Sequence, residues 1–471
     1  MKKLTSTSLR FIPGAFGLAC CLLASNASAA VLYFDPNGAS PVTAGTYTWD
    51  TTSLEWSTSS ALTGSPVAWN SADAACFTAG SFTGNITVDV NSAINVAGIF
   101  NGNLTPPGCN LTLSGSGSLV FPSGAQALGS GGGDGNYMTM NIPITGTGAA
   151  PESEMAGVNN LYLYTPNTYT GGFILGSTSN GGSPPQYGVD FNNNQAFGIG
   201  GTISSTSSTA QRNILTPLAA QTPGALVLSQ GLTLWNGVFS YSGVAIAPVT
   251  FTGNSTLSTA GNTSTIQVQS TIDAGAGTAT LTLSGVMSGA GNLAKTGAGN
   301  LVLSGANTYT GSTTISAGRL QLGAANTIAS SSSVIMAGGT LDPDGFHHVM
   351  SGTLSLTANS TIDYTSGTAE IDFADSSAAT WTAGKTLNLV STGGGNWNTS
   401  GDELNFNENP IGLDGVRLSQ IEFNGTDLGD AAINDNGFIF DSAQPIPEPS
   451  TIVLSLLGGL GLLWNIRRRT V

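Results

Sequence analysis

The stretch that decides the fold runs from Gly291 to Leu322 and reads GNLAKTGAGNLVLSGANTYTGSTTISAGRLQL. Apolar residues alternate with small polar ones in three short runs, at 301–303, 313–315 and 319–322, and this alternation predicts strands with one buried face. Glycines between the runs, as in Ser304-Gly305, predict turns because glycine adopts positive φ readily. Three strands and three turns within about two dozen residues predict one coil of a right-handed parallel β-helix.

A second copy of this pattern lies earlier in the chain. Residues 160–171 (NLYLYTPNTYTG) match residues 300–311 (NLVLSGANTYTG) at eight of twelve positions. One coil cannot bury its apolar face alone, so repetition along the chain is what a stack of coils requires. Asn307 has two candidate roles in such a stack: a turn residue with positive φ, or an amide that stacks on the equivalent amide of the next coil.

The rest of the chain between the termini shows the same alternation of apolar and small polar residues. Alternating runs recur at 86–90, 111–113, 281–283, 354–356 and 387–389, and no helical period is evident between them. Glycine accounts for 65 of 471 residues and charged side chains for only 8%, whereas an ordinary domain has about 7% glycine and about 25% charge. This composition excludes coiled coils, helix bundles and most cytosolic enzymes. The 40% apolar content is enough to build a core, so we predict an all-β protein.

The amino terminus is typical of a Sec signal peptide at residues 1–29. Basic residues precede an apolar run at 11–24, and the small residues Ala27 and Ala29 occupy the cleavage positions. The Sec translocon and signal peptidase are therefore expected partners. The alternative is a lipoprotein signal that ends at Cys20.

After cleavage the chain retains two cysteines, Cys76 and Cys109. In an oxidising compartment such a pair often forms a disulfide, but two free buried thiols are the open alternative.

The mature chain is strongly acidic. Between residues 30 and 446, five basic residues stand against 25 acidic ones, a net charge of −20 (5 − 25). Such a surface repels nucleic acid and anionic lipid, so neither is an expected partner.

The carboxyl terminus has three parts. A proline-rich motif comes first, an apolar segment at 452–466 follows, and three arginines come last; the motif and the arginines are Pro447, Glu448, Pro449, Ser450, Arg467, Arg468 and Arg469. The prolines hold the motif in a rigid, extended form. A membrane helix needs about 20 apolar residues, so the short segment spans a bilayer only if the arginines reach the cytoplasmic face. A simple tail anchor is the alternative.

This tail closely resembles the PEP-CTERM sorting signal. The resemblance implies processing by an exosortase, a transient inner-membrane span, and export from a Gram-negative-type bacterium to the cell surface or the extracellular matrix. Residues 291–323, with a partial copy at 159–175, resemble the autotransporter-associated β-strand repeat. That second resemblance implies a passenger-like β-helix, and we expect no self-export through an attached translocator barrel.

Together these features divide the chain into five segments. They are the helical signal peptide (1–29), an aromatic amino-terminal cap (30–80), the β-helix (81–394), an acidic carboxyl-terminal cap (395–444) and the sorting signal with its transmembrane helix (445–471). The caps are expected to prevent end-to-end stacking, because an open strand edge promotes aggregation.

Few residues are candidates for chemistry. His347 and His348 are the only histidines; we interpret them as solvated loop residues, with a metal site as the alternative, and adjacent histidines on a strand would face opposite sides. Asp342 and Asp344 are either a carboxylate pair for sugar chemistry or parts of a turn, and the intervening Pro and following Gly favour the turn. The acidic region 427–435 lacks the spaced ligands of a calcium loop.

We therefore predict no catalytic, cofactor-binding or metal-binding residues. The expected function is that of an exported, non-enzymatic β-helix that is adhesive or structural in exopolysaccharide or biofilm, with extracellular polysaccharide as a candidate partner. The alternatives are a polysaccharide lyase or hydrolase on the same fold, and a passive spacer without a ligand.

Overall fold

In the computed structural model, the described part of the chain is almost entirely β-structure. The structure describes residues 30–444 except for 37, 39–41, 64, 71–72, 78–83, 102–109, 123–125, 132–136, 147–150, 157–159, 176–186, 206–211, 218–224, 244–247, 271–278, 392–400, 407–408, 410–411 and 426–429. The chain forms two compact units: an amino-terminal unit up to residue 321 that includes 327–332, and a carboxyl-terminal unit of 322–326 and the residues from 333 onward. Each unit is described by itself.

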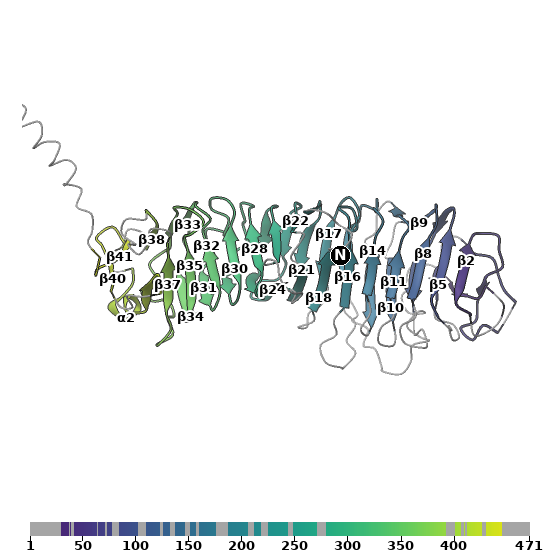
Figure 1. The fold of residues 1–471 in the computed structure, drawn as a ribbon, viewed down its shortest axis with the longest axis horizontal. Coiled ribbons are helices and arrows are strands. Elements are labelled where there is room, and N and C mark those ends of the chain that lie inside the picture. Colours follow the sequence, from purple (N-terminus) through teal and green to yellow (C-terminus); the bar gives the residue numbers. More distant parts are fainter. Residues whose placement is uncertain are drawn as a thin grey trace, which may run out of the picture. The chain divides into compact units, whose positions relative to one another are not determined.

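The amino-terminal unit consists of parallel stacks of short strands (Figure 1). The first stack contains, in order, β1 (Val31–Phe34), β4 (Ala74–Cys76), β7 (Gly98–Asn101), β10 (Gln126–Gly131), β13 (Pro151–Ala156), β15 (Phe173–Leu175), β17 (Thr202–Ser205), β20 (Gly231–Leu234), β23 (Ser255–Leu257) and β26 (Met287–Gly289). The second contains β2 (Gly45–Trp49), β5 (Ile86–Val90), β8 (Asn110–Ser114), β11 (Tyr137–Met140), β14 (Asn160–Leu163), β16 (Tyr187–Phe191), β18 (Arg212–Pro217), β21 (Gly237–Gly243), β24 (Thr263–Ser270), β27 (Asn292–Thr296) and β29 (Thr313–Ile315).

Two shorter stacks complete this unit. One contains β6 (Ala93–Asn95), β9 (Ser118–Phe121) and β12 (Ile144–Gly146), and the other contains β19 (Leu226–Leu228), β22 (Val249–Phe251), β25 (Thr280–Leu283) and β28 (Asn300–Leu303). β30 (Arg319–Leu322) follows near the division between the units. The three strands expected within 301–322 are thus confirmed as β28, β29 and β30.

The chain visits the stacks in turn. β20, β21 and β22 belong to three different stacks, and they pair in parallel with β23, β24 and β25. One circuit runs from Leu281 to its register partner Leu301, and the circuit before it, from Val249 to Leu281, is longer. This arrangement is compatible with the predicted β-helix.

The register keeps apolar side chains on apolar side chains. Phe251, Leu283 and Leu303 are partners in successive strands, and all three are buried. Strand residues alternate between the two faces, so an in-register parallel stack keeps one face inside throughout. Buried columns of this kind, contributed by each stack, form the core of the amino-terminal unit.

Glycines mark places where neighbouring coils nearly touch. Gly253, Gly285 and Gly305 each lie two residues beyond a strand in the same stack. A Cβ added at Gly285 would lie 2.1 Å from the carbonyl oxygen of Gly253, and one at Gly305 would lie 2.2 Å from that of Gly285. Neither has positive φ, whereas Gly318 does (+63°). The expectation of positive φ is therefore wrong at Gly305, where the reason for glycine is the close approach of two backbones.

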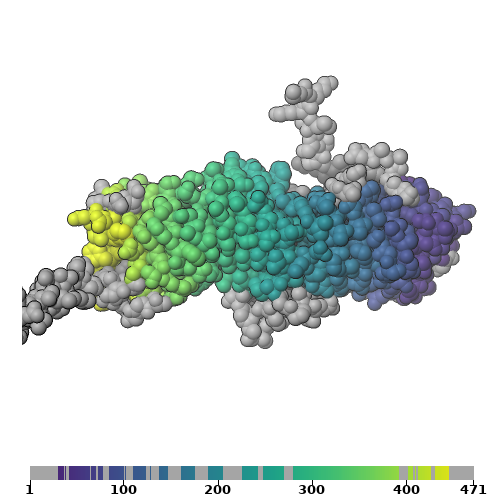
Figure 2. Space-filling model, turned by 90° about the horizontal axis from the view of Figure 1, so that it is seen from above, coloured from purple at the N-terminus to yellow at the C-terminus, as the bar shows by residue number. Residues whose placement is uncertain are grey.

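An aromatic cluster fills the first coils of the amino-terminal unit. Trp49, Trp56 and Trp69 have ring centroids 4.8 to 4.9 Å apart, and Phe34 and Phe77 pack against them. These residues belong to the purple segment that gathers at one end of this unit (Figure 2). The strand β3 (Trp56–Ser57) runs antiparallel beside β1, so the edge of β1 away from β4 is already paired. That this region blocks end-to-end stacking stays a prediction.

The carboxyl-terminal unit contains parallel strands of the same kind. β31 (Val334–Ala337) pairs with β34 (Leu354–Ala358); β32 (Thr340–Asp342), β35 (Ser360–Asp363), β37 (Leu387–Val390) and β39 (Ile421–Phe423) form one stack; and β33 (His347–Val349), β36 (Glu370–Asp372) and β38 (Glu403–Asn405) form another. β40 (Ala431–Ile433) and β41 (Ile439–Asp441) form an antiparallel pair.

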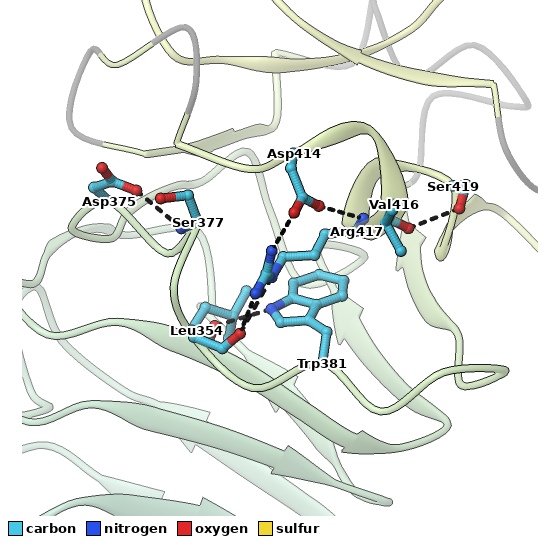
Figure 3. A network of polar contacts seen from close by, with 9 residues as sticks. Leu354, Asp375, Ser377, Trp381, Asp414, Val416, Arg417 and Ser419 are labelled. Atoms are coloured by element: carbon cyan, nitrogen blue, oxygen red, sulfur yellow. Dashed lines mark hydrogen bonds and ion pairs between the residues drawn. The ribbon is translucent and has the colours of Figure 1, made fainter.

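One short helix, α2 (Gly415–Leu418), interrupts this pattern. The Asp414 carboxylate caps its amino end by accepting from the Arg417 backbone N–H at 2.9 Å, and it pairs with the Arg417 guanidinium (Figure 3). The same guanidinium donates from Nη2 and Nε to the carbonyl oxygen of Ala379, at 2.6 and 3.2 Å. Nearby, the Trp381 indole donates to the carbonyl oxygen of Leu354 at 3.0 Å. Arg417 therefore fastens α2 to the loop that precedes Trp381.

Several expected features lie outside the described residues. These are the signal peptide with Ala27 and Ala29, the sorting signal at 445–471, and Cys109. Cys76 is buried in β4, and its pairing with Cys109 stays a prediction. Within the described ranges, none of the helices has the length and apolar character that a bilayer crossing requires.

Candidate functional site

The two histidines lie on strand β33 and face opposite sides of it. His347 is exposed and His348 is buried. The interpretation as solvated loop histidines is wrong in its loop assignment, because the chain pairs through this segment with β36, and wrong for the exposure of His348, whereas His347 is exposed to solvent as expected. The expectation that the two side chains diverge is confirmed, so only His347 is available to a partner from solvent.

His348 is held as a neutral imidazole. Its Nε2 lies 3.1 Å from the carbonyl oxygen of Pro343 and must donate to it, while its Nδ1 accepts from the backbone N–H of Asn326 at 3.1 Å. Burial lowers the pKa of His348. Both ring nitrogens are thus used inside the fold, and this residue anchors β33.

His347 meets two carboxylates from the next strand. Its Nε2 lies 3.0 Å from Oδ2 of Asp372 and 3.5 Å from Oε2 of Glu370, and one donor atom from each residue falls within 4.8 Å of the others. The parallel register aligns His347 with Glu370 and Glu370 with Glu403 of β38. Three adjacent strands therefore present a histidine and three carboxylates on one outward face.

The electrostatics of this cluster reflect crowded negative charge. The hydrogen bond to Asp372 raises the pKa of His347. Burial, and then the neighbouring charge of Asp372, raise the pKa values of Glu370 and Glu403. The cluster therefore favours a positive charge at its centre, supplied either by the imidazolium or by a bound cation.

The repeated Asn of the NTYTG motif bridges three coils. Asn307 Oδ1 accepts from the Met287 N–H at 2.7 Å, and its Nδ2 donates to the Thr327 carbonyl at 2.5 Å. In the earlier copy, Asn167 accepts from the Ile144 N–H at 2.7 Å and donates to the carbonyl of residue 196 at 2.6 Å. Neither expected role is found, since Asn307 lacks positive φ and its amide bonds to backbone groups. Its function is to join successive coils.

The repeated Tyr of the motif is buried in both copies, but its hydroxyl is hydrogen-bonded in only one of them. The Tyr309 hydroxyl lies 2.6 Å from Thr313 Oγ1, whereas the Tyr169 hydroxyl is buried with no hydrogen-bond partner. Position 173, which corresponds to Thr313, holds Phe. Burial raises the pKa of Tyr309 to about 12 and that of Tyr169 well above its usual value, so both phenols are neutral.

This difference predicts opposite effects of the same substitution. Tyr309→Phe should lower the free energy of unfolding by about 1 kcal/mol, because a net hydrogen bond is lost. Tyr169→Phe should leave it unchanged or raise it by about 1 kcal/mol, because an unsatisfied buried hydroxyl is removed. Urea denaturation of the two variants and the parent measures both. Equal losses in the two variants would contradict this account.

The Asp342 and Asp344 pair forms a turn, as the sequence favours. Asp342 is buried, and its carboxylate accepts from the Asp344 N–H at 2.8 Å and from the Ser366 hydroxyl at 3.0 Å. Asp344 has φ of +54° and Gly345 of +75°. The hydrogen bonds of the Asp342 carboxylate thus stabilise the turn.

Of the acidic region 427–435, residues 427–429 lie outside the described residues.

Lys295 of the repeat is used inside the fold. Its side chain is buried, and Nζ donates to the carbonyl oxygens of Thr296, Gly297 and Ala317 at 2.8 to 3.0 Å. Burial lowers the pKa of this amine to about 7. The residue thus contributes little positive charge to the surface.

The His347 cluster was not found from the sequence because no local motif contains it. Its members lie on three separate strands of successive coils: His347 on β33, Glu370 and Asp372 on β36, and Glu403 on β38. The cluster could be found only from the strand pairing, which places His347, Glu370 and Glu403 at the same register position in adjacent strands.

Comparison with known families agrees with both sequence resemblances. Residues 445–469 match the PEP-CTERM protein-sorting motif, and residues 293–322 match the passenger-associated-transport-repeat. No curated protein and no solved structure matches the chain. The sorting motif marks an exported protein tied to the cell envelope and implies processing by an exosortase. The chain thus carries this sorting motif behind a largely parallel β body that bears a passenger-type repeat.

Proposed function

We propose that the processed chain is a non-enzymatic protein of the cell surface or extracellular matrix, folded as a right-handed parallel β-helix, that adheres to extracellular polysaccharide. Its export and its processing by an exosortase follow from the tail. The adhesive role rests on the outward face of the second stack, in the amino-terminal unit.

That outward face carries hydroxyl and aromatic groups in register. Thr87, Thr112, Thr139 and Tyr162 are partners in successive strands, so the three threonine hydroxyls repeat at about the 4.8 Å spacing between strands and the Tyr162 ring follows them in the next strand. Tyr162 also lies between two other rings, 5.6 Å from Tyr137 and 5.5 Å from Tyr164. Aromatic rings with a polar edge beside a row of hydroxyls suit the apolar faces and hydroxyls of sugar rings. The row of Tyr137, Tyr162 and Tyr164, called the tyrosine row, is the observation that carries the proposal.

Charge favours a neutral or weakly charged glycan. Of the five basic residues of the mature chain, Lys295 is buried against backbone carbonyls and Arg417 is committed to Asp414 and Ala379. Little positive charge is then left to hold an acidic polymer against a net charge of −20.

Glycan binding by the purified secreted chain tests the proposal. We expect retention of neutral exopolysaccharide in affinity electrophoresis, and we expect Tyr162→Ala to weaken it about tenfold, because the sugar ring loses the apolar aromatic surface on which it packs and about 1.4 kcal/mol corresponds to a tenfold change in affinity. A matched control is Trp235→Ala, which removes an exposed aromatic ring (52% accessible) that follows β20 in the same unit and lies outside the tyrosine row.

The same panel of glycans separates adhesion from cleavage. Chain shortening of any glycan that is abolished by Asp342→Asn or Glu370→Gln would establish a polysaccharide-active enzyme and overturn the non-enzymatic proposal. Absence of both binding and cleavage across the panel would favour a passive spacer.

A further inference from the structure

We propose that His347, Glu370 and Asp372 form a binding site for a divalent transition-metal ion of the zinc class, on the outward face of β33 and β36. Glu403 of β38 adds negative charge beside it. This inference concerns the carboxyl-terminal unit alone and does not depend on the glycan proposal.

The distances between donor atoms already suit a metal ion. Zinc binds imidazole nitrogen and carboxylate oxygen at about 2.0–2.2 Å, and ligands at that radius lie about 3.0–3.5 Å apart in octahedral or tetrahedral arrangements. His347 Nε2 lies 3.0 Å from Asp372 Oδ2 and 3.5 Å from Glu370 Oε2. An ion can therefore enter between them with small side-chain movements.

The charge around the cluster lacks compensation by basic side chains. Among the described residues, the ion pairs of Glu370 and Asp372 are made with His347 and with no lysine or arginine. The second carboxylate oxygen of Asp372, Oδ1, is buried without a hydrogen-bond partner. A buried, unpaired carboxylate oxygen is costly, and a cation beside it would offset that cost.

The donor set selects the class of ion. An imidazole nitrogen with two carboxylates suits zinc and neighbouring first-row metals, whereas calcium and magnesium prefer all-oxygen sites. The site is also pre-organised, because parallel pairing aligns the two strands and the buried His348 fixes β33 from the opposite side. His347 is half exposed, with 52% of its side chain accessible, so coordination positions stay open to water or to a partner molecule.

Zinc titration of the secreted chain, purified without a polyhistidine tag and stripped with EDTA, tests the site. Isothermal titration calorimetry should show one equivalent of Zn²⁺ bound, and thermal unfolding should shift upward with added Zn²⁺. His347→Gln and Asp372→Asn should each weaken binding at least tenfold, because changes even in the groups that support metal ligands cost about 10–100-fold. Glu422→Gln, which removes one carboxylate from β39 outside the cluster, should leave the affinity within twofold.

Three results would overturn the inference. They are the absence of Zn²⁺ binding at 100-fold molar excess, parent-like affinity in both His347→Gln and Asp372→Asn, and stabilisation by Ca²⁺ but not by Zn²⁺. His347 is exposed, so His347→Gln is expected to fold, and a far-ultraviolet circular dichroism spectrum equal to that of the parent confirms it. A Co²⁺ complex should show nitrogen and oxygen coordination, and a thiolate charge-transfer band would instead assign the ion to a cysteine.

Discussion

Replacing Asn307 with alanine is expected to destabilise the amino-terminal unit by about 2–6 kcal/mol. The substitution leaves two buried backbone groups, the Met287 N–H and the Thr327 carbonyl, without the partners they have at 2.7 and 2.5 Å. Each unsatisfied buried group costs about 1–3 kcal/mol. Urea denaturation measures the loss, and native-state hydrogen exchange should show that the Met287 amide loses protection.

Two companion variants make this test specific. Asn167→Ala removes the same bridge in the earlier copy of the motif and should cost a similar amount. Asn436→Ala changes an exposed turn residue in the carboxyl-terminal unit and should alter stability by less than about 0.5 kcal/mol. If Asn307→Ala behaved like Asn436→Ala, the bridging role would be refuted.

Gly285→Ala should cost about 3 kcal/mol or more, although alanine is the smallest possible addition. The new Cβ would lie 2.1 Å from the Gly253 carbonyl oxygen, which is backbone and cannot move aside as a flexible side chain does. Overpacking of a well-filled interior typically costs about 1–3 kcal/mol, and here two coils would have to separate. We expect a lower urea midpoint and weaker amide protection in β22 and β25.

The matched control is Gly415→Ala in the first turn of α2. A Cβ there meets nothing within 4 Å, and alanine is favoured over glycine in a helix by about 0.8–1.0 kcal/mol. This variant should therefore be neutral or slightly stabilising. A small effect of Gly285→Ala, similar to that of Gly415→Ala, would mean that the coils have more room between them than the structure describes.

The strands of the repeat could be predicted from sequence because each is specified by the alternation of residues within the strand itself. Alternation of Leu and small polar residues at 301–303 and 319–322 fixes which side chains face inward, and this is the arrangement found in β28 and β30. The turn at Asp342 was predictable for the same reason, since an Asx side chain acts on its own backbone two residues later.

The rest depends on contacts between coils, which the linear sequence does not display. Asn307 and Gly285 are explained by backbone groups of the neighbouring coils, so turn propensity does not account for either residue, although it does account for Gly318. The cluster at His347 likewise forms only when three successive coils align at equal register. The helix α2 has four residues, too few for a periodic pattern to be recognised.

The unequal circuits of the amino-terminal unit have a consequence for how such a molecule can evolve. The circuit from residue 249 to residue 281 is longer than the one from residue 281 to residue 301, yet the strand partners stay aligned, so the connections absorb the difference. A lineage can therefore graft a new loop between two strands, or duplicate or delete a whole coil and change the stack by about 4.8 Å, while every other layer keeps its neighbours. The length of the stack and the loops on its surface can then change independently of each other during evolution.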